Sequence, residues 1–417
     1  MKKERVLLIF FLLTATLSMF PAISSAQLVL GQYEGEAPFR TWNTFPFAGA
    51  AALGRGETCF ALASDASSAL SNPALLPGLP KFSLTIGGYY QVAEFYKYGP
   101  VNTGVMGTEN NIGQGLFGLD SAGVSYSLGG WAFALNVSVT ELYNRPEAKY
   151  EETYGDGSAY LLDFTQEGIL RNINFSIGRR IFPWLSAGLG LNYVTGSLHR
   201  KLLEQETPVG YTISDQIGQD FTGFFINGGF LVEISDKFKA AAVFRTPYAK
   251  KAANSGVLRY SYATSSGAPP DIVISASSND VAEQPPILGF GLSYAVLPEL
   301  VLTADSTYFA WSKYKLDEFG EKQERDFKDI VKLGAGAEYT AQAGVFGAQA
   351  SIPFRIGLVY DPQPMKNPGS SYIAFTFGNG VHWKNLRLDL GAMLGRESGS
   401  GNSLAVKRFA LSLGFNL

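Results

Sequence analysis

The sequence predicts an all-β fold, a transmembrane antiparallel β-barrel of about 14 strands with an N-terminal hatch that plugs its lumen. Two observations carry this prediction. From residue 81 to the end of the chain, apolar and polar residues alternate in one stretch after another. Charged residues make up only 17% of the chain, below the roughly 25% that is typical of soluble domains.

Seven stretches show the alternation most clearly. Large apolar side chains stand at every second position, and mostly small or polar residues stand between them. Strands of about ten residues with one apolar and one polar face are the signature of a barrel that crosses a lipid bilayer. The stretches are residues 82–90, 131–140, 185–193, 288–294, 331–339, 352–360 and 409–417.

The charged residues of these strands distinguish a membrane barrel from a soluble β-sandwich, which also alternates. Lys332, Glu338, Arg355, Arg387 and Asp389 fall on the polar face, while the apolar face carries no charge. Charged side chains suit a wet interior, and apolar side chains suit lipid. The pattern therefore favours a barrel.

About 15 candidate strands follow residue 81, and single-chain bacterial barrels favour even numbers. The Ser- and Pro-rich residues 263–279 are the weakest candidate and are expected to form a loop. Residues 94–119, 143–166, 197–220 and 314–326 are expected as longer external loops. A barrel of this size is too wide for its own side chains to fill, so it holds a plug or forms a pore.

The N-terminus predicts export to the outer membrane of a Gram-negative type cell. Basic residues at positions 2, 3 and 5 precede an apolar run at residues 6–20 and the small residues Ser24-Ser25-Ala26. This order is the pattern of a secretory signal peptide. We expect residues 1–26 to be this peptide, residues 27–80 to be the hatch and residues 81–417 to be the barrel.

The segment before the first strand differs from everything after it. Residues 51–76 are rich in glycine, alanine and serine, and residues 65–68 suit a helix cap or a turn. Six glycines fall on the polar face of later strands, where the missing side chains leave room for a plug. They are Gly188, Gly190, Gly289, Gly291, Gly334 and Gly336.

Several function classes find no support in the sequence. The net charge of −3 and the absence of basic runs argue against nucleic acid. One cysteine, Cys59, forms no internal disulfide, and two histidines, His199 and His382, show no metal-ligand spacing. We expect no cofactor and no metal, and no enzymatic activity because no nucleophile and base stand in a recognisable motif.

Two blocks of sequence resemble the FadL-type long-chain fatty acid transporters. The first resembles their N-terminal hatch and comprises ALGRG at residues 52–56, ASDASSA at 63–69 and NPA at 72–74. The second comprises WS at 311–312, FKD at 327–329, KLGAGAEY at 332–339 and FRIGLVYD at 354–361. Both blocks stand in the family's order and spacing.

The resemblance implies a 14-stranded barrel whose N-terminal segment plugs the lumen. It also implies diffusive uptake of hydrophobic molecules, with a sideways exit through the wall beside a kinked strand. Long-chain fatty acids are the expected ligands, and aromatic hydrocarbons are the alternative. The expected partners are this hydrophobic small molecule and outer-membrane lipid, and the barrel is expected to be a monomer.

The expected gating residues lie in the hatch. For the Asn72-Pro73-Ala74 turn, the functional interpretation is movement that couples ligand binding to opening. The alternative is a rigid turn, because Pro73 fixes its own φ and restricts Asn72 to extended conformations. The predicted hatch and gating residues are Gly54, Arg55, Asp65, Asn72, Pro73 and Ala74.

A fatty acid needs cations for its carboxylate, since burying an unpaired charge is unfavourable. Candidates at the outer end of the barrel follow one strand and precede another: His199, Arg200 and Lys201, then Lys322, Arg325 and Lys328. Ser197 stands where the resemblance implies a basic residue, which favours a neutral substrate. Arg355 is a further ligand-binding candidate, with an ion pair to Asp65, Asp361 or Asp389 as the alternative.

A second hypothesis keeps the architecture and changes the function. The barrel would not conduct, and would serve as a scaffold or a secretion-associated protein. A lumen filled by ionic contacts with no gap in the wall favours this hypothesis, whereas a continuous apolar path favours transport.

Overall fold

The computed structural model describes residues 45, 47–95, 112–153, 155, 157–207, 211–262, 271–318, 321–323, 326–345, 347–367, 369–399 and 403–417. The predicted signal peptide, residues 96–111 of the first expected loop and Arg325 therefore lie outside the described residues. The described chain forms one antiparallel sheet that closes on itself, because the first strand pairs with the last.

The sheet contains nineteen strand segments, which combine into 14 barrel strands. Five barrel strands are interrupted: β3 continues as β4, β8 as β9, β10 as β11, β12 as β13 and β14 as β15. The bounds are β1 Phe82–Phe95, β2 Ile112–Leu128, β3 Trp131–Leu142, β4 Arg145–Thr153, β5 Ala159–Phe182, β6 Leu185–Thr207, β7 Tyr211–Glu233, β8 Phe238–Arg245, β9 Tyr248–Tyr262, β10 Ile272–Gln284, β11 Ile287–Leu297, β12 Leu300–Phe309, β13 Lys315–Glu318, β14 Glu321–Gln323, β15 Ile330–Val345, β16 Ala348–Pro362, β17 Ser371–Trp383, β18 Leu386–Ser398 and β19 Ala405–Asn416.

Short turns gather at one end of the barrel, where β2 meets β3, β5 meets β6 and β17 meets β18. The β2–β3 turn needs Gly129 and Gly130, which both have positive φ, as a tight hairpin turn requires. Short turns mark the periplasmic end of such barrels. No helix in the described part of the chain is long and apolar enough to span a bilayer.

The side chains follow the predicted alternation. Apolar residues such as Ile86, Leu189, Phe290 and Leu413 are about half exposed on the outer wall, while their neighbours in sequence are buried inside. The apolar wall therefore faces lipid and the polar wall faces the lumen. This agrees with the prediction along the seven alternating stretches, except at Val139 and Ile352, which are only 3% and 5% exposed.

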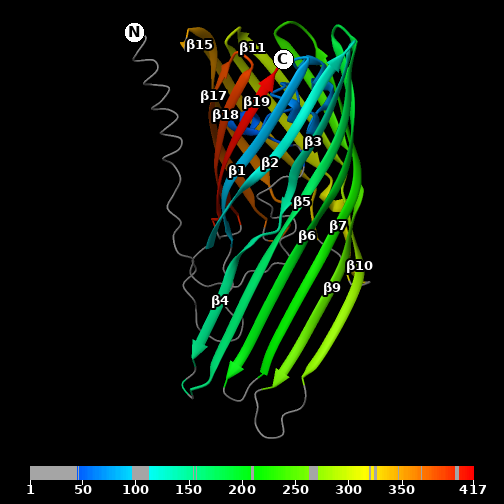
Figure 1. Cartoon of the computed structure of the whole chain (residues 1–417), viewed down its shortest axis with the longest axis vertical. Coiled ribbons are helices and arrows are strands. Elements are labelled where there is room, and N and C mark those ends of the chain that lie inside the picture. The colour runs from blue at the N-terminus through cyan, green and yellow to red at the C-terminus, as the bar shows by residue number, and fades with distance from the viewer. Residues whose placement is uncertain are drawn as a thin grey trace.

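All four expected external loops contain strand residues: 94–119 includes the end of β1 and the start of β2, and 314–326 includes β13 and β14. The other two differ most from the expectation. Residues 143–166 and 197–220 contain β4 and the outer parts of β5, β6 and β7, which are 23 or 24 residues long. Only about 9–11 residues cross the bilayer, so these strands continue far beyond it. With β9 and β10 they form a projecting sheet in the order β4-β5-β6-β7-β9-β10, called the outer sheet below (Figure 1).

The expectation for residues 263–279 is also wrong where the structure describes them. Residues 272–279 belong to β10, which pairs with β9 without a register shift. Serine-rich strands with both faces exposed lack the apolar alternation that identifies a membrane strand, so composition suggested a loop.

Residues 47–79, called the inner segment below, lie inside the barrel. They form helix α2 (Ala50–Gly54) and the 3-10 helices η1 (Ala66–Leu70) and η2 (Pro73–Gly78). Helix α2 contacts β16–β19, η1 contacts β1, β2, β3 and β5, and η2 contacts β2, β3, β5, β6 and β7. Only a segment within the lumen can touch strands on all of these sides.

Lumen glycines allow the inner segment to approach the wall at backbone distance. A Cβ on Gly336 would lie 2.3 Å from the Arg55 carbonyl oxygen, and one on Gly334 would lie 2.3 Å from the Gly56 carbonyl oxygen. Five of the six glycines singled out in the sequence face the inner segment. Gly190 instead faces the wall side chains of Ser176, Asn174 and Asn227.

Replacing Gly336 by alanine is expected to loosen the inner segment, because the new methyl group meets backbone that cannot rotate away. Overpacking of this kind costs about 1–3 kcal/mol. The readout is the rate at which a maleimide labels the buried Cys59, which should rise about tenfold.

Gly344→Ala on the same strand is the matched control, since nothing lies within 4 Å of the position of its Cβ. Equal labelling rates in the two variants would show that the lumen glycines do not seat the inner segment.

Candidate functional site

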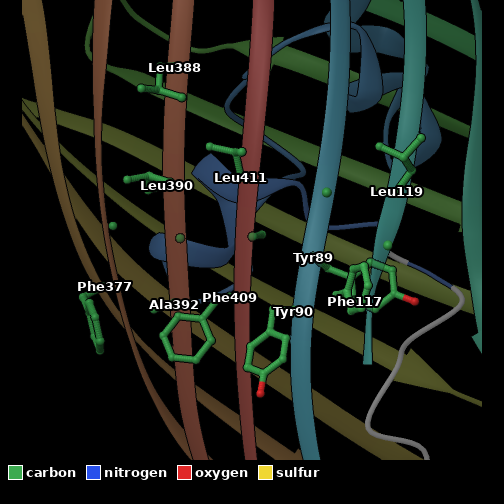
Figure 2. A pocket seen from close by; sticks show the side chains of 15 residues that line it. Tyr89, Tyr90, Phe117, Leu119, Phe377, Leu388, Leu390, Ala392, Phe409 and Leu411 are labelled. Atoms are coloured by element: carbon green, nitrogen blue, oxygen red, sulfur yellow. The ribbon is translucent and has the colours of Figure 1, made fainter. Parts of the chain in front are cut away.

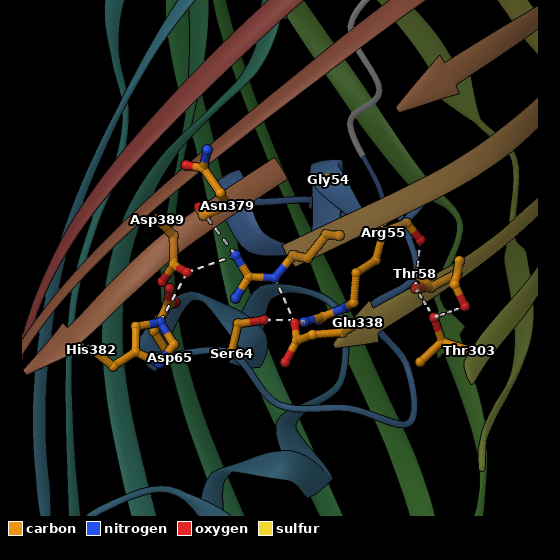
Figure 3. A network of polar contacts seen from close by, with 12 residues as sticks. Gly54, Arg55, Thr58, Ser64, Asp65, Thr303, Glu338, Asn379, His382 and Asp389 are labelled. Atoms are coloured by element: carbon orange, nitrogen blue, oxygen red, sulfur yellow. Dashed lines mark hydrogen bonds and ion pairs between the residues drawn. The ribbon is translucent and has the colours of Figure 1, made fainter. Parts of the chain in front are cut away.

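An ionic network joins the inner segment to the wall at Arg55 (Figure 3). Arg55 is 2% exposed, and its guanidinium donates to Glu338 Oε2 at 2.6 Å and to Ser64 Oγ at 3.1 Å. Arg355 Nε donates to the same carboxylate oxygen at 2.5 Å. Glu338 of the wall therefore pairs with Arg55 of the inner segment and with Arg355 of the wall.

Arg355 continues the network into β18. Its Nη1 lies 2.8 Å from Asp389 Oδ1, which also lies 3.0 Å from His382 Nε2. Arg387 Nη2 lies 3.5 Å from the other oxygen of Asp389, and Arg387 also donates to the Ser64 carbonyl. Arg355 thus makes the ion pair with Asp389 that the sequence offered as the alternative to ligand binding.

A second ionic group lies around Glu57. Its carboxylate contacts Lys332 Nζ at 2.5 Å and Arg408 Nη1 at 3.9 Å, and Lys332 also lies 3.6 Å from Asp361. Burial raises the pKa of Glu57, but the two cations outweigh it, and the net pKa is below the ordinary value. The carboxylate is therefore charged in the lumen and fixes the chain just after α2.

The two predicted hatch turns are capped rather than open. Asp65 accepts hydrogen bonds from the Ser67 backbone N–H at 2.8 Å and from Ser67 Oγ at 2.6 Å, so it caps η1. Asn72 Oδ1 accepts from the Ala74 N–H at 3.0 Å, and its Nδ2 donates to the Phe60 carbonyl at 2.7 Å. Pro73 follows as the first residue of η2, which is the rigid turn expected as the alternative to gating.

Gly54 ends α2 against the wall. A Cβ there would lie 3.0 Å from the Gly378 Cα, and the Gly54 carbonyl accepts from Thr376 Oγ1 at 3.2 Å. Movement of Gly54, Arg55, Asp65, Asn72, Pro73 and Ala74 stays a prediction, although all six lie in the contact between the inner segment and the wall.

Cys59 is a natural reporter of this contact. Asp305 of β12 accepts the N–H groups of Cys59 at 2.6 Å and of Phe60 at 3.0 Å. Burial, and then the charge of Asp305, raise the pKa of the thiol well above its ordinary value. The thiol is therefore unreactive while the inner segment is seated.

The wall is not paired evenly all round. The β2–β3 ladder runs from Leu128↔Trp131 only to Ser121↔Ser138, whereas β1 pairs with β2 as far as Phe95↔Ile112. Over residues 112–119, the described ladder therefore joins β2 to β1 alone. β3 then pairs with β5 alone, and Figure 1 shows β2 and β3 diverging.

A bulge lies on each side of this gap. Asp120 is an extra residue in β2 opposite β1, and Thr140 is an extra residue in β3 opposite β5. Asp120 and Ser121 are consecutive buried residues, while Leu119 and Ala122 are exposed. Bulges bend a strand and end pairing, so the two bulges separate β2 from β3 at this level.

Eight residue pairs, from the periplasmic turn to Ser121↔Ser138, separate the gap from the periplasmic end of the barrel. At about 3.3 Å per residue and a tilt of about 40°, they rise roughly 20 Å. The apolar band of such barrels is about 25 Å tall. The gap therefore begins in the outer part of the band.

Apolar groups surround the gap on both faces. Tyr89 and Val139 are buried in a cluster with Leu116, Leu142 and Ile169. On the outer wall, Phe117 is 84% exposed and Leu119 is 71% exposed. Apolar side chains thus lie on the lumen side and on the lipid side of the gap, beside the buried polar residues Asp120 and Ser121.

An apolar hollow of about 700 Å³ lies next to the gap in the outer wall (Figure 2). It spans β17, β18, β19, β1 and β2, and the inner segment lies behind these strands in the view. Small residues such as Gly88 and Ala392 form its floor between larger side chains. Its larger lining side chains include Tyr90, Phe117, Leu119, Phe377, Leu388, Leu390, Phe409 and Leu411.

The predicted cations for a carboxylate do not form one site. His199 and Arg200 lie on β6, and Lys322 and Lys328 lie on and after β14, which is not a neighbour of β6. His199, Lys201, Lys322 and Lys328 are exposed, and Arg200 lies 3.7 Å from Asp215. A ligand-binding role for each of them stays a prediction.

Two buried cations in the outer half of the lumen escaped prediction. Arg245 donates to the Pro285 carbonyl at 2.6 Å and faces the rings of Phe225 and Tyr248. Lys250 lies 3.0 Å from Glu141 and faces the rings of Tyr143 and Phe221. The sequence signals near these two cations are Pro247, between β8 and β9, and Pro285-Pro286, between β10 and β11.

Among the described residues, no group of three or more His, Cys, Asp or Glu side chains is placed to hold a metal ion.

Comparisons with known proteins identify the fold. The model of a protein family described as BamG matches residues 64–417. None of the curated proteins compared with the chain matches it. A toluene transporter of Ralstonia pickettii, TbuX, is 14% identical, with 90% of this chain and 99% of that chain covered and a TM-score of 0.58.

Two further structures are similar over the same length. A FadL homologue of Pseudomonas aeruginosa is 14% identical, with 90% of this chain and 100% of that chain covered and a TM-score of 0.63. The toluene transporter TodX of Pseudomonas putida is 14% identical, with 91% and 100% covered and a TM-score of 0.63. The predicted 14-stranded barrel and the FadL-type resemblance are confirmed at the level of fold.

Glu338→Gln is expected to destabilise the seated inner segment more than Arg55→Met. The first change leaves both Arg55 and Arg355 without this carboxylate, whereas the second leaves the Arg355 pair intact. Breaking a buried pair costs about 3–5 kcal/mol. The measurement is Cys59 labelling in increasing concentrations of urea.

Lys315→Met breaks an exposed ion pair with Glu283 and is the control, with an expected effect of at most about 1 kcal/mol. If Arg55→Met released the thiol at lower urea than Glu338→Gln, Glu338 would not be the centre of the network.

Proposed function

Because the chain belongs to the BamG family and has the fold of FadL-type outer-membrane barrels, we propose that it is a channel for diffusive uptake of hydrophobic compounds. In this proposal residues 27–80 act as a hatch. A ligand enters from the outside, passes the outer lumen and leaves sideways between β2 and β3. No step requires an energy source.

The gap between β2 and β3 is the observation that carries this proposal. A closed barrel pairs every strand on both edges, and lipid-exposed unpaired backbone is unfavourable. Here two bulges hold the wall apart inside the apolar band, and apolar side chains lie on both faces of the opening. A sideways exit into lipid accounts for the gap, which a sealed barrel would not need.

The lumen supports a neutral ligand better than the expected long-chain fatty acid. Five buried lumen cations lie within 4 Å of a carboxylate, so their charge is already compensated. They are Arg55, Lys250, Lys332, Arg355 and Arg408. A fatty acid would rely on Arg245, which donates to the Pro285 carbonyl, or on exposed cations such as His199 and Lys328, whereas an aromatic hydrocarbon needs none.

Uptake by whole cells tests the proposal. Cells with and without the protein are given labelled oleate and labelled toluene in parallel. We expect faster uptake of toluene with the protein, and a smaller gain or none for oleate. No gain for either compound would overturn the transport function.

Removing both bulges should close the exit without refolding the rest of the wall. Deleting Asp120 restores the alternation between Leu119 and Ser121, and deleting Thr140 removes the register shift between β3 and β5. Toluene uptake through the double deletion is expected to fall about tenfold, since a continuous ladder replaces the opening.

Deleting Val296 removes a bulge opposite β12 near the periplasmic turn and is the control, with uptake expected to stay at the wild-type rate. Unchanged uptake in the double deletion would exclude the β2–β3 exit.

A barrel that does not conduct is the second candidate, with a scaffold or secretion-associated role. The ionic contacts between the inner segment and the wall favour it, because they hold the lumen occupied. Deleting residues 27–80 separates the two. Loss of selective uptake together with a new open pore supports a hatch, whereas no change in uptake or conductance contradicts both a gate and a plug.

A further inference from the structure

The outer sheet has two edges, because it continues only part of the barrel beyond the membrane. One edge is β4, which pairs with β5, and the other is β10, which pairs with β9 (Figure 1). A sheet edge presents a row of backbone N–H and C=O groups that another extended chain can pair with. An edge that carries no protecting residues is therefore open to pairing with another chain.

The β10 edge is open over eight residues. β9 covers one side of β10 continuously, from Ile272↔Tyr260 to Gln284↔Tyr248. On the other side β13 reaches only Val281, Ala282 and Glu283. No strand in the described parts of the chain pairs with residues 272–279 on that side.

The side chains of this stretch offer an apolar surface and no charge. Ile272, Val273 and Ile274 are 46%, 51% and 50% exposed. Residues 272–279 read IVISASSN and contain no charged residue, proline or glycine. Natural edge strands are usually protected by charges, proline or bulges.

The β4 edge shows this protection in the same sheet. Its sequence, RPEAKYEET, contains one proline and five charged residues. The sequences of the two edges thus have opposite chemistry. The difference indicates that only the β10 edge is kept available for pairing.

We propose that residues 272–279 of β10 are a strand-addition site for an extended segment of another polypeptide on the outer side of the membrane. Backbone pairing of this kind supplies affinity, and alternate side chains supply specificity. Ile272 and Ile274 share a face with Tyr260 and Leu258 of β9. The segment should therefore carry aliphatic residues at alternate positions, to extend this apolar face.

A second copy of the chain fits the edge poorly. Two copies in one membrane are related by an axis along the membrane normal, and the barrel strands are tilted from that normal. The two β10 strands would then run outward together and cross, so they could not form an antiparallel ladder. An independent segment has no such restriction and can align with the edge.

The probe for the test is a labelled synthetic peptide with the sequence of residues 251–260, KAANSGVLRY. This segment already pairs with β10 in the structure, so its side chains match the faces of β10. The full chain in detergent is titrated with the peptide, and binding is followed by fluorescence anisotropy. Saturable binding is expected, and the same peptide with every backbone N–H methylated should not bind, because neither of its edges can then donate hydrogen bonds.

Two protein variants locate the binding. Ile274→Lys combined with Ala276→Lys protects the β10 edge with charge and should weaken binding about tenfold or more. Ala148→Lys places a charge on the β4 edge and should leave binding unchanged. A heat-modifiable band on gels shows that each barrel is folded.

Equal affinity of wild type and the β10 variant would overturn the proposal, as would binding of the N-methylated peptide. A stable dimer that the β10 variant abolishes, without peptide binding, would also overturn it and assign the edge to a second copy.

Discussion

The structure depends on one constraint: in lipid, the backbone of every strand must find its hydrogen bonds within the protein. Closure of β1 onto β19 meets that constraint for the barrel as a whole. The gap between β2 and β3 departs from it inside the apolar band, at Ser121↔Ser138. Such a departure is costly, and two bulges and an apolar cluster are arranged around it.

A similar constraint applies in the lumen, where buried charged side chains need partners of opposite charge. Two carboxylates join the inner segment to the wall: Glu338 of the wall pairs with Arg55, and Glu57 of the inner segment pairs with Lys332 and Arg408. Glycines such as Gly334 and Gly336 let the two backbones touch. The contact is therefore close but polar, and water can take the place of polar contacts.

Much of this could be read from the sequence, because alternation directly reports which face meets lipid. The strand faces, the lumen glycines and the caps at Asp65 and Asn72 follow from local chemistry. The outer sheet could not be predicted, since β5–β7 beyond the membrane are wet on both faces and lose the alternation. The bulges at Asp120 and Thr140 add one residue each without changing the composition of their strands. The sequence offered Asp65, Asp361 and Asp389 as partners of Arg355, and only the packing of the strands selects Asp389.

The two departures from complete pairing lie in different solvents, and this separates their roles. Water can hydrogen-bond to the exposed N–H and C=O groups of the β10 edge at little cost. A polypeptide can later replace this water. Lipid offers no such substitute beside β2, so nothing except protein or a hydrophobic molecule can occupy that gap. The proposed peptide site therefore suits the outer sheet, and the proposed exit for a lipid-soluble ligand suits the gap between β2 and β3.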